Sequence, residues 1–135
     1  MWLGFLFVQL VTLLAIFVKR RARITFIAEP RIDEPKLREI VRRLVTAYQP
    51  SKIYLFGSCA RGDVGPDSDY DLLVVVPDDA SRERRRSRFA YQVLRGIGTA
   101  VDVLVCTRGY FNARLHLKAS LPGTVIREGK LLHAA

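Results

Sequence analysis

Two aspartates separated by one tyrosine are the residues of this sequence best suited to chemistry. Asp69 and Asp71 open an apolar run, and alternate residues of a β-strand point to the same face, so their carboxylates are expected side by side. Two carboxylates that close raise each other's pKa unless a cation lies between them. Because hard divalent cations, Mg²⁺ above all, prefer oxygen ligands, the pair predicts a metal site.

A glycine and a serine upstream of the pair have the properties that a phosphate-binding turn requires. Gly57 and Ser58 interrupt an apolar run, and ten residues separate them from Asp69. Glycine lets the backbone approach a phosphate closely, and the turn offers free N–H groups and a hydroxyl. A phosphate-binding turn that faces a metal-binding pair indicates phosphoryl or nucleotidyl transfer.

A third carboxylate, Asp102, is the only charge in the apolar run Val101–Cys106. A lone carboxylate inside such a strand is costly unless it is paired or bound to metal. Three carboxylates suit a two-metal mechanism, in which Asp69 and Asp71 bridge both ions and Asp102 completes the second. The alternative is structural: Asp69 caps the strand, Asp71 is exposed and Asp102 pairs with an arginine.

The elements that must position these residues follow from hydrophobic periodicity and from turn residues. The sequence predicts helices over Pro35–Tyr48, Ser58–Arg61, Ser81–Gly96 and from Thr107 to about Lys118, and strands over Lys52–Phe56, Tyr70–Val76 and Val101–Cys106. The second strand is expected to be buried on both faces because it is apolar throughout. After Pro122 and Gly123 we expect Val125, Ile126, Leu131 and Leu132 to pack back on the domain.

Composition limits the chain to one ordinary domain. It has 135 residues, half of them hydrophobic, which supplies one core. Two cysteines, Cys59 and Cys106, are too few for a disulfide framework or for a zinc site with four ligands, so we interpret them as small buried residues. His116 and His133 have no partner at a ligand spacing, and we expect them on or near the surface.

The formal net charge of +9 raises the question of nucleic-acid binding. Most of this charge comes from two short clusters, at residues 19–23 and 82–88, and neither has interleaved aromatic residues for base stacking. The second cluster is interpreted as the solvated face of the helix Ser81–Gly96. Direct contact with nucleic acid is therefore not favoured by the sequence.

Residues 1–23 form an apolar segment with a basic flank. Residues 2–18 carry no charge, and a helix of this length would reach about 25 Å, the short end of a membrane span. The basic residues follow the apolar run, which is the wrong order for a secretory signal and places the rest of the chain on the cytoplasmic side of a membrane. Membrane anchor, non-native extension and partner-covering helix remain competing interpretations, and the segment is expected to be dispensable for chemistry.

The spacing of these motifs resembles the nucleotidyltransferase fold of the DNA polymerase β superfamily. The shared pattern begins with Gly57-Ser58, continues after ten residues with Asp69-x-Asp71, and ends with Asp102 in a third strand. The residues around this pattern resemble the minimal nucleotidyltransferase branch. The resemblance covers about Asp33 to Leu132, so residues 33–135 are expected to form the nucleotidyltransferase domain. It implies an α/β fold in which helices flank a small mixed sheet. It assigns metal binding to Asp69, Asp71 and Asp102, and phosphate binding to Gly57, Ser58 and Arg61.

The resemblance also implies a reaction and a partner. Members of the branch act as antitoxins beside HEPN-type toxins, and some transfer AMP from ATP to a tyrosine of the toxin with the help of Mg²⁺. Only 29 residues follow Cys106, so the acceptor site is expected to be completed by another chain in a hetero-oligomer in the cytoplasm. The alternatives are an antitoxin that neutralises its partner by contact without catalysis, and a membrane-tethered signalling protein.

Overall fold

A computed structural model describes residues 35–62 and 69–135 of the chain. The apolar segment 1–23 and residues 63–68, between Gly57-Ser58 and Asp69, lie outside these residues. Within the described ranges, no helix combines the length and the apolar character that crossing a membrane requires.

The described residues build one mixed four-stranded sheet in the order β3-β2-β1-β4. The strands are β1 (Lys52–Phe56), β2 (Tyr70–Val76), β3 (Val101–Thr107) and β4 (Lys130–Ala134). Strand β1 runs antiparallel to both β2 and β4, whereas β3 runs parallel to β2. The predicted small mixed sheet is confirmed, and so is the burial of its second strand, because six of the seven residues of β2 are buried.

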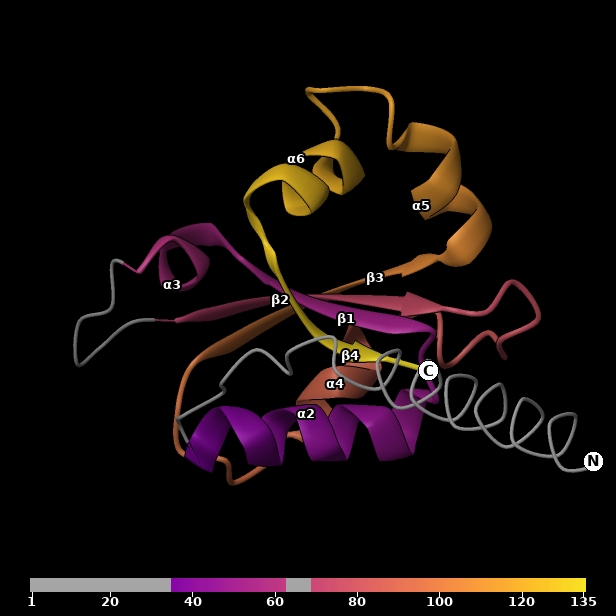
Figure 1. Cartoon of the computed structure of the whole chain (residues 1–135). Helices are drawn as coiled ribbons and strands as arrows, with labels where there is room; N and C mark the ends of the chain where they lie inside the picture. Colours follow the sequence, from indigo (N-terminus) through magenta and orange to yellow (C-terminus); the bar gives the residue numbers. More distant parts are fainter. Residues whose placement is uncertain (1–34, 63–68) are drawn as a thin grey trace, which may run out of the picture. The chain divides into compact units, whose positions relative to one another are not determined.

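Helices cover both faces of this sheet (Figure 1). The first face carries α2 (Pro35–Tyr48) and α4 (Arg88–Val93), and the second carries α5 (Arg108–Arg114) and α6 (Leu121–Glu128). Short helix α3 (Gly57–Arg61) follows β1 directly. A hydrophobic core lies on each face of the sheet, and alternate side chains of β2 point into one core or the other. Leu72 and Val74 pack with α2, whereas Leu73 and Val75 pack with Phe111 of α5. Asp71 has the same parity as Leu73 and therefore belongs to the second face.

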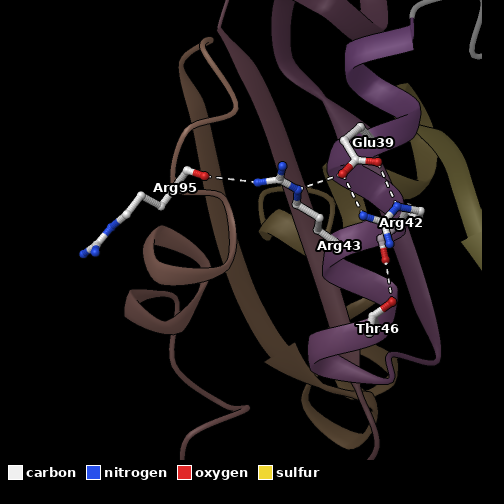
Figure 2. A network of polar contacts seen from close by, with 5 residues as sticks. All are labelled: Glu39, Arg42, Arg43, Thr46 and Arg95. Atoms are coloured by element: carbon white, nitrogen blue, oxygen red, sulfur yellow. Dashed lines mark hydrogen bonds and ion pairs between the residues drawn. The ribbon is translucent and has the colours of Figure 1, made fainter.

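Helix α2 has the predicted bounds because its apolar positions recur at helical spacing. Its exposed side carries the network in Figure 2, in which Glu39 accepts hydrogen bonds from Arg42 at 2.7 Å and from Arg43 at 2.9 Å. The hydrogen bond from Arg42, followed by that from Arg43, lowers the pKa of Glu39 to about 2. Arg43 also donates to the carbonyl of Arg95 at 3.1 Å, which ties α2 to the turn after α4.

The predicted helix Ser81–Gly96 is wrong over its first half, because only Arg88–Val93 is helical. Residues 82–87 form single turns, in which the Arg86 amide donates to the carbonyl of Glu83. Close like charges disfavour a helix here. The guanidinium of Arg85 instead donates to the carbonyls of Asp78 and Ala80, at 2.6 and 2.8 Å. The arginines are therefore not the solvated face of a regular helix.

The C-terminal part of the chain has more regular structure than the sequence indicates. The helix capped by Thr107 ends at Arg114 instead of near Lys118. Helix α6 and strand β4 were not predicted, and β4 pairs with β1, far away in sequence. Val125 is fully buried as expected, but Ile126 does not pack into the core and is 52% exposed.

We predict that Tyr48→Phe lowers the free energy of unfolding by about 1 kcal/mol, because it removes a hydrogen bond from a buried site. The Tyr48 hydroxyl donates to the carbonyl of Arg86 at 2.9 Å, and burial raises the pKa of Tyr48 to about 12, which keeps this donor protonated. Urea unfolding measures the loss. Tyr91→Phe is the matched control, since Tyr91 is 66% exposed and should tolerate the change. Equal stability of the two variants would contradict the role of the hydrogen bond.

Candidate active site

Asp71 and Asp102 are direct partners across the parallel pair β2–β3. Neighbouring strands lie about 4.8 Å apart, and residues in register point to the same face of a sheet. Asp69 precedes Asp71 by two residues, immediately before β2 begins. The fold thus brings all three predicted carboxylates to one end of two adjacent strands.

The electrostatics of Asp71 reflect the presence of the other two carboxylates. Burial raises the pKa of Asp71 above its ordinary value, and the charges of Asp102 and then Asp69 add to this shift. The structural alternative for Asp102, pairing with an arginine, is not found: within 35–62 and 69–135 no lysine or arginine forms a salt bridge with any of the three. Among the described residues, the site is a concentration of negative charge that no lysine or arginine salt bridge balances.

Gly57 lies against the carboxylate of Asp71. A Cβ atom added at Gly57 would come within 2.3 Å of Asp71 Oδ2, and the residue has a φ of +70°, which side chains rarely adopt. Register explains the contact, because Phe56 pairs with Asp71 and places Gly57 just beyond it. Glycine is therefore needed here to make room for Asp71, a reason that the sequence pattern did not supply.

Cys59 is a site residue that sequence reasoning missed. It is buried, as predicted, but its Sγ also donates to the carbonyl oxygen of Asp69 at 3.1 Å. The bond ties α3 to the backbone that carries the first carboxylate. The sequence holds no signal for it, because a buried cysteine and a positioning cysteine have the same local pattern.

The remaining predicted residues lie on α3. Ser58 is half-buried in its first turn, and Arg61 is exposed in its last turn, before the C-cap Gly62. Their proximity to the carboxylates follows from the contact of Gly57 with Asp71 and from the bond of Cys59 to Asp69. Phosphate binding by these residues stays a prediction.

Asp102 is not the enclosed carboxylate that its apolar strand suggested. Asp102 is exposed, so burial does not force it to bind metal or a counter-ion. It lies on β3, which ends the sheet, and an outer strand can carry a charge that a central strand could not.

The donor set suits a hard divalent cation, since it consists of carboxylate oxygens that form no salt bridge with a described lysine or arginine. The set is nevertheless open: among the residues whose positions are described, no three acidic, histidine or cysteine side chains are gathered into a complete metal-binding group. Water or substrate oxygens would have to supply the remaining ligands.

Comparisons with known proteins agree with this geometry. The family model described as "nucleotidyltransferase domain" matches residues 34–128. A protein of Methanocaldococcus jannaschii named "Putative protein adenylyltransferase" is 30% identical over 109 residues, covering 75% of this chain and 98% of that protein. A crystal structure described as a toxin–antitoxin with AMP-PNP aligns with a TM-score of 0.52 and 24% identity, over 76% of this chain and 75% of that one.

The chain therefore belongs to the nucleotidyltransferase domain family. The sequence-based prediction of a nucleotidyltransferase enzyme with this family's fold is confirmed.

We predict that Gly57→Ala and Gly96→Ala each lower the free energy of unfolding by about 1–2 kcal/mol, because both glycines have positive φ. Only Gly57→Ala should also lose nucleotidyl transfer, because its methyl group displaces Asp71, whereas nothing lies within 4 Å of a Cβ at Gly96. Urea unfolding and label transfer from ATP measure the two effects. Full activity of Gly57→Ala would show that the position of Asp71 does not depend on this glycine.

We predict that Asp71→Asn is more stable than the wild-type protein at pH 7 in buffer with EDTA. The raised pKa of Asp71 means that the folded state binds its proton more tightly, so ionisation of Asp71 costs stability as pH rises through that pKa. The advantage of the variant should vanish as pH falls below the ordinary pKa of 3.8. Melting temperatures across this range test the sign, with exposed Asp79→Asn as control; an advantage that persists at pH 3 would contradict it.

Proposed function

We propose that this protein is a Mg²⁺-dependent nucleotidyltransferase that transfers AMP from ATP to a hydroxyl group of a partner protein, a HEPN-type toxin. The observation that carries the proposal is the uncompensated set of Asp69, Asp71 and Asp102 in a member of the nucleotidyltransferase domain family. The name of the archaeal relative supports a protein acceptor, and the description of the aligned crystal structure supports an adenine nucleotide and a toxin partner.

The three aspartates would hold Mg²⁺, which when bound neutralises phosphate charge and lowers the pKa of the attacking hydroxyl. Mg²⁺ commonly keeps waters and binds one or two carboxylates together with substrate phosphates. An open carboxylate set is suited to metal that binds together with its nucleotide.

The residues of the chain have separate roles in this reaction. The acceptor oxygen forms a bond to the α-phosphorus of ATP, the bond from that phosphorus to the bridging oxygen breaks, and pyrophosphate leaves. Asp102 is the exposed carboxylate on the outer strand, and we assign to it the uptake of the hydroxyl proton. Ser58, the backbone at Gly57 and the guanidinium of Arg61 are assigned to the phosphates of ATP.

We predict that Asp69→Asn with Asp71→Asn abolishes label transfer from α-³²P-ATP to the co-purified partner in the presence of Mg²⁺. The amides keep the size of the side chains but remove both charges, so metal and triphosphate lose their ligands. Asp79→Asn is the matched control, because it removes an exposed carboxylate that follows β2 at its other end, and it should transfer at the wild-type rate.

The outcomes separate the proposal from its rival. Transfer by the double variant at the wild-type rate would reject these residues as the catalytic set. Wild-type protein that neutralises its partner without transferring label would instead identify an antitoxin that acts by contact.

A further inference from the structure

The positive charge of this protein is concentrated in the described domain. Residues 35–62 and 69–135 contain 17 lysines and arginines against 8 aspartates and glutamates, which equals the net charge of +9 for the whole chain. Five of these arginines and one glutamate fall within residues 82–88. Only those of the five that lack an internal partner are available to a ligand.

Two of the five arginines hold the backbone of the segment in place. Arg85 donates to the carbonyls of Asp78 and Ala80, and Arg84 donates to the side chain of Gln49 at 3.0 Å. The Tyr48 hydroxyl donates to the carbonyl of Arg86 from the other side. Residues 82–88 are therefore fixed to the end of β2 and to the end of α2.

The other three arginines form no such hydrogen bonds within the described part of the chain. Arg82, Arg86 and Arg88 are exposed, and within the described part of the chain their guanidinium groups have no hydrogen bond or salt bridge. Arg42 and Arg43 on α2 show the contrast, since both are paired with Glu39 (Figure 2). The three free cations line one hollow of about 480 Å³ together with Glu83, Phe89 and Gln92.

The hollow lies away from the carboxylates. Asp71 and Asp102 are the second residues of β2 and β3, whereas the segment 82–88 that lines the hollow is bonded through Arg85 to the turn after the last residue of β2. Val76 lies five positions after Asp71 along the strand, a distance of about 17 Å. In Figure 1 the turn after β2 and helix α3 accordingly lie at opposite ends of the sheet.

We propose that Arg82, Arg86 and Arg88 form a binding site for a single strand of nucleic acid. Guanidinium groups bind phosphate oxygens as planar pairs of donors, and a strand presents phosphates in series. Phe89 provides an apolar wall and Gln92 an amide within the same hollow, whose volume is in the range of small-ligand sites. A strand is favoured over a single small anion because three guanidinium groups line one continuous hollow and can each take a successive phosphate.

The test is fluorescence anisotropy with a fluorescein-labelled 15-nucleotide oligouridylate and the full chain, at KCl concentrations from 25 to 200 mM. We expect Arg82→Gln, Arg86→Gln and Arg88→Gln together to weaken binding at least about tenfold at the lowest salt. The slope of log K against log salt should fall by about 2, since each lost contact to a single strand removes about 0.7. Arg82→Gln alone should remove about 0.7 from the slope.

The control is the triple variant Arg38→Gln, Arg95→Gln and Lys118→Gln, which removes the same charge from exposed positions on other elements. Equal loss in the control would reject a defined site in favour of general attraction. Tighter binding of a 15-residue polyglutamate peptide would assign the hollow to an acidic protein, and equal competition by tripolyphosphate per phosphate would assign it to a small anion; either result overturns the proposal. Neither triple variant touches the carboxylates, so label transfer from ATP tests the nucleotidyltransferase proposal separately.

Discussion

The carboxylate of Asp71, held against the backbone of Gly57, is the contact on which the arrangement of the site depends. It requires a residue without Cβ at the exact point where β1 ends, and it requires β1 and β2 to be antiparallel in the observed register. Burial and two neighbouring carboxylates both oppose ionisation of Asp71. The domain therefore has a well-packed core that ends in a locally unfavourable group, and such a combination is typical of sites where a ligand supplies the missing interaction.

The same sheet separates two kinds of charge. Its carboxylates gather where β2 and β3 begin, and the unpaired arginines gather beyond the end of β2. Each group is fixed by bonds to backbone carbonyls: Cys59 bonds to Asp69 at the first end, and Arg85 bonds to Asp78 and Ala80 at the second. The parallel β2–β3 pair, joined through α4, is what places both groups on a rigid frame.

The sequence predicted the elements whose stability is local. Helix α2 and strands β1 and β2 have the predicted bounds because apolar spacing and flanking turn residues determine them. The first half of the helix predicted at Ser81–Gly96 failed because Arg85 bonds to carbonyls outside the segment, which no periodicity reveals. Strand β4 was missed because Lys130–Ala134 becomes a strand only by pairing with distant β1.

In the candidate site, too, the features set by local sequence could be predicted, and those set by distant contacts could not. The types and spacing of Asp69, Asp71 and Asp102 predicted that the carboxylates share one face, and the register of β2 with β3 agrees. The exposure of Asp102 could not be predicted, because the sequence does not say which strand ends the sheet. The reason why position 57 requires glycine could not be predicted either, since it depends on the contact of Gly57 with Asp71 of the neighbouring strand.

The division of the carboxylates between a central and an outer strand has a consequence for how this fold can change over evolutionary time. Strand β2 is enclosed by two cores and two neighbours, so substitutions there must satisfy packing before they can alter chemistry. Strand β3 pairs with β2 on one side only within the described residues, and Leu104 at its centre is 36% exposed. The surface around Asp102 can therefore diversify while Asp71 and its surroundings stay constant.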